Sequence, residues 1–423
     1  MMNKSVVLIM ICASLASCGS GKVSAPDLGG IYTRAAMRSH EEGNPVIVIP
    51  GILGSRLRDS ETGQLVWGAF EKSTADPESP EGARLVAVPM AKGLPLDELH
   101  DNVRSDGALD KVKVSLFGLP IELGAYINIL STLGAGGYLD ESLAKNELNQ
   151  IDYGNDHFTC FQFDYDWRLD NVENAKKLKE FIEEKKEYIL EEYKKRGIDR
   201  ADVRFDIVAH SMGGLVTRYF LLYGGADLPS DGSAPTVTWE GADHVEKVVI
   251  IGTPNGGAIG AVENLLVGRD FGPFLPKYEP AIIGTMPSLY QQLPRTRHKA
   301  VKDRESNVVD MTDPEVWVQN GWGLADPGQE EVIAWLLPDV PDASERREIA
   351  IDHMKKSLAR GRQFQDAIDV PAEPPEGLRV YLVAGAAIQT GSGAPVSGEG
   401  VKFEITDDDP GAGAVTRASA IPA

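Results

Sequence analysis

The 423-residue chain has little cysteine and no long apolar segment in its body. Its three cysteines are Cys12, Cys18 and Cys160. The first two belong to an N-terminal segment with a separate role, so Cys160 is left without a partner and no internal disulfide is expected. No run of about 18 apolar residues follows the N-terminus, and the sequence therefore predicts no membrane-spanning helix in the body.

Basic residues are scarce relative to acidic ones. The 63 Asp and Glu residues outnumber the 42 Lys and Arg residues, which gives a formal net charge of −21. Such a charge repels polyanions, so we expect no binding to nucleic acid or to an anionic membrane surface. The hydrophobic content of 42% is that of an ordinary globular protein and excludes extensive disorder. The length allows several average domains, or one large α/β domain with insertions.

Residues 1–18 look like a bacterial lipoprotein signal peptide. Lys4 precedes a short apolar stretch, residues 6–15, which cannot span a bilayer. The residues Leu-Ala-Ser-Cys-Gly that follow resemble a lipobox, with Cys18 as the lipidated residue; an ordinary secretory signal is the alternative. Residues 19–44 would then form a tether. We expect a lipid-anchored protein of the cell envelope, either periplasmic or at the outer membrane.

One short stretch predicts a catalytic serine. Residues 205–209 are mostly apolar, as expected of a strand buried on both faces of a parallel sheet. Residues 215–223 are an apolar segment of helical length. Ser211 lies at the turn between them, with the small residues Ala209 and Gly213 two positions away on either side. This pattern is typical of the nucleophile elbow of α/β-hydrolases, and an ordinary helix-start serine is the alternative.

A second apolar strand is predicted at residues 46–49 and runs into a glycine-bearing loop at residues 50–57. In an α/β-hydrolase the loop after this strand supplies one backbone N–H to the oxyanion hole, and the residue after the nucleophile supplies the other. Ile52 and Met212 are therefore the candidate oxyanion donors. The alternative is that the loop is only a tight turn.

The rest of the chain predicts one domain with insertions. Further core strands are predicted at residues 158–168, 245–252 and 378–385. A long amphipathic helix is expected at residues 171–196, with Asn171 as its cap and Gly197 at its end. Two irregular segments, at about 59–156 and 265–375, are interpreted as cap insertions over the site. We thus expect an α/β-hydrolase domain at residues 45–423, with a mostly parallel sheet flanked by helices.

Five motifs occur along the chain in a characteristic order. They are Ile-Pro-Gly with Gly-Ser-Arg-Leu (49–57), Tyr-Asp-Trp-Arg (165–168), Ala-His-Ser-Met-Gly-Gly (209–214), Gly-Thr-Pro-Asn-Gly-Gly (252–257) and Met-Pro-Ser-Leu-Tyr-Gln-Gln-Leu-Pro (286–294). Together they resemble the lecithin–cholesterol acyltransferase family, which includes phospholipid–diacylglycerol acyltransferases and related lysosomal phospholipases. The resemblance implies a serine that takes an acyl group from a lipid ester and passes it to an alcohol or to water. It also implies that Trp67 belongs to a lid that touches lipid, whereas a buried structural tryptophan is the alternative.

The catalytic acid of the family has no counterpart at its usual position. The family carries this acid in a Gly-Asp-Gly-Thr-Val run. The matching residues 411–415 read Gly-Ala-Gly-Ala-Val, with Ala412 in place of the aspartate. Asp409 or Asp408, in an acidic turn expected at residues 407–410, could substitute as the acid. A solvated acidic turn is the alternative.

A catalytic histidine is the larger gap. All seven histidines occur at or before His353, and the last strand, histidine loop and closing helix of the family are expected to be missing. His298 and His353 could reach over the site from the second insertion, whereas His157 and His244 precede their strands and His210 is commonly non-catalytic in the family. Loss of the base costs a serine hydrolase roughly 10⁶ in turnover, against roughly 10⁴ for the acid. The chain is therefore either a piece of a longer enzyme, which we favour, or an inactive relative.

The sequence thus predicts an anchored lipid acyl hydrolase or O-acyltransferase that acts on a lipid ester in lipid metabolism. No metal cluster or phosphate-binding loop is recognisable, so neither a metal nor another cofactor is expected. The alternative function is an inactive lipoprotein that uses the same pocket to bind lipid or to scaffold a partner.

Overall fold

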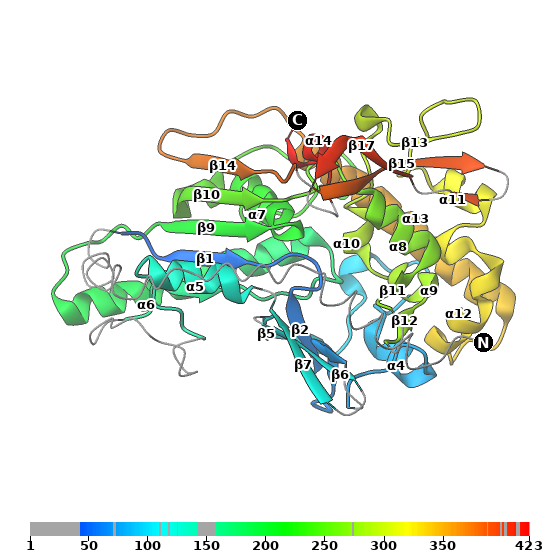
Figure 1. Cartoon of the computed structure of the whole chain (residues 1–423), viewed down its shortest axis with the longest axis horizontal. Helices are drawn as coiled ribbons and strands as arrows, with labels where there is room; N and C mark the ends of the chain where they lie inside the picture. Colours follow the sequence, from blue (N-terminus) through cyan, green and yellow to red (C-terminus); the bar gives the residue numbers. More distant parts are fainter. Residues whose placement is uncertain are drawn as a thin grey trace, which may run out of the picture.

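A five-stranded parallel sheet forms the centre of the protein, with strand order β14-β10-β9-β1-β8 (Figure 1). The computed structural model describes residues 43–70, 73–109, 111–116, 119–124, 126–142, 157–272, 275–386, 388–397, 400–401, 404–411 and 415–422. The strands are β1 (Val46–Ile49), β8 (Cys160–Gln162), β9 (Phe205–His210), β10 (Val245–Ile251) and β14 (Arg379–Val383). The helices that flank them include α5 (Ile127–Ala135), α6 (Asn171–Arg196) and α7 (Met212–Tyr223). This arrangement confirms the predicted α/β class.

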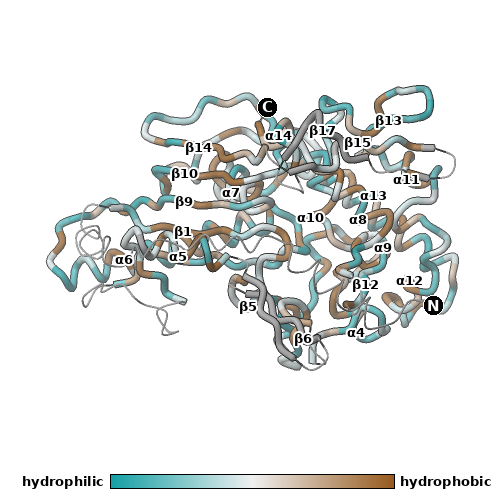
Figure 2. Tube along the Cα trace, viewed as in Figure 1, coloured by the Kyte–Doolittle hydropathy of each residue, from teal (hydrophilic) through white to brown (hydrophobic). Residues whose placement is uncertain are grey.

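Strand β1 is buried on both of its faces, as its uninterrupted apolar sequence predicted. Val46 and Val48 pack against α5 in a small core on one side of the sheet. Ile47 and Ile49 point to the other side and join the large core that α6 and α7 complete. Figure 2 shows the same apolar character along β10, which lies on the other side of β9 in the sheet. Helices on both faces are the usual environment of a parallel sheet.

Strand β14 is an exception at the edge of this sheet. Its four apolar side chains, Val380 to Val383, are between 39% and 49% exposed, although the strand pairs in register with β10. An edge strand has a neighbour on one side only, and its side chains pack correspondingly less. The sheet is therefore closely covered at β1 and β9, where the predicted site lies, and open at β14.

Two smaller sheets and a short helix precede the core strand β8, in the lower part of Figure 1. These elements are β2 (Ser55–Asp59), β3 (Leu65–Trp67), β4 (Ala69–Phe70), α4 (Pro80–Val86), the 3₁₀ turn Leu96–Glu98, β5 (Val103–Ala108), β6 (Lys111–Leu116) and β7 (Leu119–Gly124). They occupy most of the first segment that the sequence analysis interpreted as a cap. The division into domain and caps itself stays a prediction.

The second predicted cap contains several short helices and one long helix, α13 (Ala343–Ile368). The elements from there to the C-terminus are α8 (Ile259–Val267), β11 (Arg269–Asp270), β12 (Lys277–Tyr278), α9 (Pro280–Ile283), α10 (Pro287–Tyr290), β13 (Val301–Lys302), α11 (Pro314–Asn320), α12 (Glu330–Leu336), α13 (Ala343–Ile368), β15 (Ile388–Ser397), β16 (Gly400–Val401), β17 (Glu404–Gly411) and α14 (Arg417–Ala420). Single-turn 3₁₀ segments join several of them. A longer 3₁₀ segment, Glu240–His244, lies earlier in the chain between α7 and β10. Among the helices described, none is both long and apolar enough to cross a bilayer.

Two local predictions were wrong. The acidic residues 407–410 lie within strand β17 rather than in a turn: β17 pairs antiparallel with β15 on either side of them, at Thr406 and at Gly411, and the register is irregular in between. The amino-terminal cap of α6 is Asp170, whose carboxylate accepts a hydrogen bond from the N–H of Val172 at 2.9 Å. The predicted end of that helix at Gly197 is confirmed, since this glycine has a positive φ of 69°.

Candidate active site

Ser211 lies at a strained turn between β9 and α7. Its backbone has φ 52° and ψ −126°, a conformation that side-chain-bearing residues rarely adopt. Two hydrogen bonds hold this backbone: the N–H of Ser211 donates to the Ile251 carbonyl at 2.8 Å, and the Ser211 carbonyl accepts from the Thr253 hydroxyl at 2.8 Å. The turn places Ser211 where the sequence pattern predicted the elbow. Strain of this kind persists when the surrounding structure fixes it.

The glycines around Ser211 are explained by close approach. In the sheet, Ile49 at the end of β1 pairs with Ala209 near the end of β9. The loop after β1 therefore begins at the same edge of the sheet as the elbow. A Cβ atom on Gly51 would lie 2.7 Å from the Cβ of Ser211, and one on Gly213 would lie 2.4 Å from the Pro50 carbonyl oxygen. Neither position has room for a side chain. The loop after β1 therefore packs directly on the elbow.

Aromatic side chains anchor this loop through its carbonyl groups. The Tyr165 hydroxyl donates to the Pro50 carbonyl at 2.8 Å, and the Trp67 indole N–H donates to the Leu53 carbonyl at 2.8 Å. The indole N–H of Trp167 reaches the carbonyl of Ser55, the first residue of β2, at 3.2 Å. Leu53 itself has a positive φ of 63°. The loop is thus held in a conformation that its own sequence does not favour.

Two backbone N–H groups beside Ser211 are available to a ligand. The N–H of Ile52 makes no hydrogen bond to any residue that the structure describes. Met212 is the first residue of α7, and the N–H at that position has no acceptor within its helix. The positive end of the helix dipole adds to its attraction for negative charge. These are the two N–H groups that the sequence analysis named as candidate oxyanion donors. Their role in catalysis stays a prediction.

A cavity of about 600 Å³ opens beside the nucleophile, with Ser211 and Ile52 in its lining. Trp67, Phe271 and Tyr278 form an aromatic wall, in which the ring centroids of Trp67 lie 5.6 Å from Phe271 and 5.9 Å from Tyr278. The lining of this compartment is predominantly apolar, which suits a hydrocarbon chain.

Trp67 is a buried tryptophan that also borders the cavity. It lines the cavity, yet its side chain is only 6% exposed and its indole N–H holds the loop after β1. The lining also includes the apolar side chains of Met286 and Leu289 from the last of the five motifs. Arg269 borders the same space, with its guanidinium 5.2 Å from the Phe271 ring centroid. Whether Trp67 contacts lipid stays a prediction.

Neither histidine of the second predicted cap contacts the nucleophile. Ser211 Oγ makes no hydrogen bond to any residue in the described part of the chain. His353 is fully buried on α13, and its Nε2 donates to the Thr285 carbonyl at 2.9 Å. Burial lowers the pKa of His353 to about 4, so its ring is neutral and belongs to the core. His298 lines a separate small cavity, where its Nε2 would lie 2.2 Å from a Cβ on Gly256.

The other residues singled out in the sequence lie away from Ser211 or outside the described part of the chain. His244 directly precedes β10 and His157 comes shortly before β8, so both lie at the opposite end of the sheet from Ser211, as expected. Asp409 lies in β17, and its side chain is outside the described residues, as are Ala412 and Cys18. The acid and the lipidation site therefore stay predictions. Cys160 is a free cysteine that is fully buried in the core.

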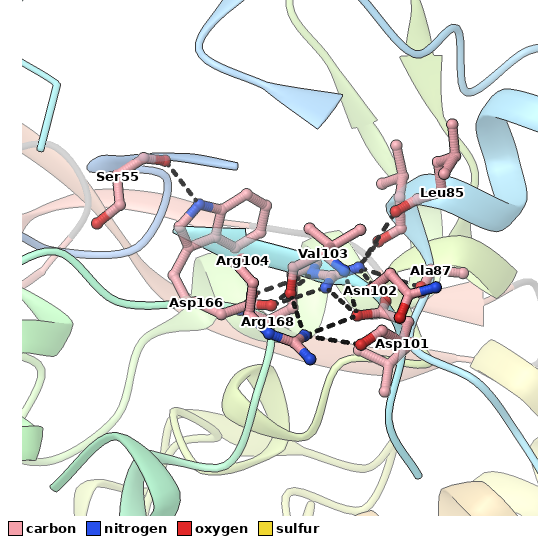
Figure 3. Close-up of polar contacts among 12 residues, drawn as sticks. Ser55, Leu85, Ala87, Asp101, Asn102, Val103, Arg104, Asp166 and Arg168 are labelled. Carbon is pink, nitrogen blue, oxygen red and sulfur yellow. Dashed lines mark hydrogen bonds and ion pairs between the residues drawn. The ribbon is translucent and has the colours of Figure 1, made fainter. Parts of the chain in front are cut away.

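A buried ion-pair cluster lies next in the chain to Trp167, the residue that contacts Ser55 (Figure 3). Arg168 is fully buried and contacts Asp166 at 2.7 Å and Asp101 at 3.0 Å. The same guanidinium donates to the carbonyls of residues 85–87. Burial alone would lower the pKa of Arg168, but the two carboxylates outweigh it and raise the pKa above its ordinary value. No role could be predicted for the Tyr-Asp-Trp-Arg motif from sequence, because Asp101 and the carbonyls of residues 85–87 lie far from Arg168 in the chain.

Comparison with known proteins identifies a related family. The family model described as lecithin:cholesterol acyltransferase matches residues 134–321. No curated protein sequence matches the chain. Among solved structures, the crystal structure of the Tle4–Tli4 complex matches with 17% sequence identity and a TM-score of 0.44, and the match covers 76% of this chain and 72% of that chain.

The matched residues contain four of the five motifs noted in the sequence, including the elbow at 209–214. The loop motif at 49–57 lies outside the match. The match therefore confirms the family resemblance: over residues 134–321 this chain is similar to the lecithin:cholesterol acyltransferase family, whose description names acyltransferase enzymes.

Proposed function

We propose that this protein is a lipid acyl hydrolase or O-acyltransferase that forms an acyl-enzyme at Ser211. The observation that carries the proposal is the strained backbone of Ser211, with φ 52°, at the border of an apolar cavity of about 600 Å³. A nucleophile next to a compartment for hydrocarbon is the arrangement that attack on a lipid ester requires. The family match supports the same reaction class.

In the proposed mechanism Ser211 Oγ attacks the ester carbonyl and gives up its proton. The N–H groups of Ile52 and Met212 stabilise the negative charge on the tetrahedral intermediate. The carbon–oxygen bond to the leaving alcohol then breaks, the alcohol takes a proton, and the acyl group stays on the serine. Water or a second alcohol completes the cycle by the reverse steps. The structure brings no described histidine to Ser211, so the proton transfer is assigned to no residue.

Fluorophosphonate labelling tests this proposal, because such probes react with an activated serine. We expect the full chain to be labelled at Ser211 and to hydrolyse a soluble ester. Ser211→Ala removes the attacking oxygen and should abolish labelling and lower turnover by about 10⁶-fold. Ser306→Ala is the matched control, since Ser306 also has a positive φ, of 68°, but lies in an exposed turn. Hydrolysis that survives in Ser211→Ala would refute the mechanism.

A second function, lipid binding without catalysis, is favoured by one observation. No described residue hydrogen-bonds to Ser211 Oγ, although a serine nucleophile normally contacts its base. A fluorescent fatty acid such as parinaric acid distinguishes the two functions. Binding in the cavity together with an absence of labelling at Ser211 would favour the binding protein over the enzyme.

A further inference from the structure

Tyr126 lies between the oxyanion loop, residues 50–55, and the nucleophile elbow. It precedes the first residue of α5, on the face of the sheet opposite α6 and α7, and only 9% of its surface is exposed. Its ring packs closely on the loop, because a Cβ on Gly54 would lie 2.9 Å from it. The same ring contacts the His210 imidazole edge to face, at 5.6 Å between centroids.

The hydroxyl of Tyr126 joins the two segments by hydrogen bonds. It accepts from the N–H of Gly51 at 2.8 Å and lies 2.8 Å from Nδ1 of His210. A phenolic hydroxyl has one proton. Since the Gly51 N–H occupies an acceptor position, the hydroxyl proton is free to be donated to Nδ1. His210 is then neutral, with its own proton on Nε2. Burial also lowers the pKa of His210 and favours the neutral ring.

We propose that Tyr126 is a positioning residue for acyl transfer, whose hydroxyl locks the oxyanion loop to the nucleophile elbow. Gly51 immediately precedes the candidate donor Ile52, and His210 immediately precedes Ser211. One hydroxyl therefore fixes the two backbone segments that must stay in register during the reaction. Tyr126 does not line the cavity, so it acts through these neighbours rather than on the substrate. The inference rests on the proposed function, because it assigns Tyr126 a part in that reaction.

The geometry leaves little tolerance for movement of the loop. Gly51 packs against Ser211 so closely that a single Cβ atom would not fit. A misplacement of about 1 Å in a catalytic group can cost about 100-fold in rate. Loss of one oxyanion donor costs about 10² to 10³ in turnover. A partial displacement of the Ile52 donor is expected to cost less, about 10- to 100-fold.

Tyr126→Phe tests the inference in the full chain, since it keeps the ring and removes only the hydroxyl. We expect kcat for a soluble ester and the rate of fluorophosphonate labelling at Ser211 to fall about 10- to 100-fold. KM should stay within about twofold, because the cavity lining is unchanged. Tyr138→Phe is the matched control: it removes a hydroxyl just beyond the other end of α5 that hydrogen-bonds to no described residue.

Nitrogen-15 NMR of the histidine side chains adds a readout that needs no activity. The wild type should show His210 with its proton on Nε2, and Tyr126→Phe should shift the Nδ1 resonance while Tyr138→Phe leaves it unchanged. His210→Gln assigns the signal. Suppose that the wild type is labelled at Ser211. If Tyr126→Phe then reacts at the wild-type rate, or shows the wild-type Nδ1 signal, this inference is overturned and the proposed function is not. An unlabelled wild type would overturn the proposed function and the catalytic role of Tyr126 together.

Discussion

At the scale of single residues, the environment rather than the residue type decides chemical roles. Ser211 is one of several positive-φ residues, but it alone among them combines that strain with a position before a twelve-residue helix and beside an apolar cavity. His353 illustrates the opposite outcome. The sequence placed it among the candidate bases, and the fold buries it completely against the carbonyl of Thr285. Because His353 is fixed in the core, it is not placed to accept a proton from Ser211.

The burial of His353 predicts an acid-dependent loss of stability. The pKa of the folded state, about 4, lies below the ordinary value of 6.5. As the pH falls below 6.5, the unfolded chain binds a proton that the folded chain does not bind until about pH 4. Stability therefore decreases over that interval, and His353 alone contributes a loss of about 2 kcal/mol by pH 5.

Urea unfolding at pH 7 and pH 5 measures this contribution. His353→Gln keeps a side-chain donor for Thr285 but cannot titrate, so its loss of stability between the two pH values should be smaller by about 2 kcal/mol than that of the wild type. Equal pH dependence in the two proteins would show that His353 titrates normally in the folded state.

At the scale of elements, buried polar contacts join segments that are distant in the chain. Arg168 follows β8, yet its partners are Asp101, 67 residues earlier, and the carbonyls at the end of α4. The same motif places Trp167 under the first residue of β2. The cluster therefore ties the small sheets to the carboxyl end of the central sheet, where the loop after β1 is held.

The variant Arg168→Met tests how much these ion pairs contribute to the stability of the fold. The change leaves the Asp166 carboxylate, which is 3% exposed, without its cation, and we expect a loss of about 3–5 kcal/mol in unfolding free energy. Arg58→Met is the matched control, because the Arg58–Asp106 pair lies in the same region with side chains 42% and 45% exposed. A surface pair contributes about 0–1 kcal/mol. Similar losses in both variants would show that the Arg168 cluster is not energetically special.

At the scale of the whole molecule, charge and anchoring bear on where the protein works. The net charge of −21 disfavours direct adhesion of the folded domain to anionic lipid. A lipid-directed activity then needs another means of attachment. We propose that Cys18 supplies it as an acylated anchor in the cell envelope, with residues 19–44 as the tether, in agreement with the lipobox-like sequence.

Fractionation of cells that express the full chain tests the anchor. We expect the wild type in the membrane fraction and labelled by an alkyne-bearing fatty acid, because two or more acyl chains hold a protein stably on a bilayer. Cys18→Ala should abolish the label and release the protein into the soluble fraction. Cys160→Ala serves as the control, since Cys160 is buried in β8. Label that persists in Cys18→Ala would disprove the lipidation site.

The sequence by itself determined the features that depend on neighbouring residues. The buried strands β1 and β9, the turn at Ser211 and the end of α6 at Gly197 all follow from apolar patterning and from backbone conformations that few residues adopt. The family resemblance was recognisable for the same reason, because its motifs are short contiguous runs. These parts of the fold and of the site could be predicted without any tertiary structure.

Only the tertiary structure decided which distant residues meet. Tyr126 and His210 are 84 positions apart, and no local pattern links them. His353 was assigned to the core by burial, and residues 407–410 became part of a strand because β17 pairs with β15 on both sides of them. The physical reason is common to all three: contacts between segments that are distant in the chain outweigh local preference.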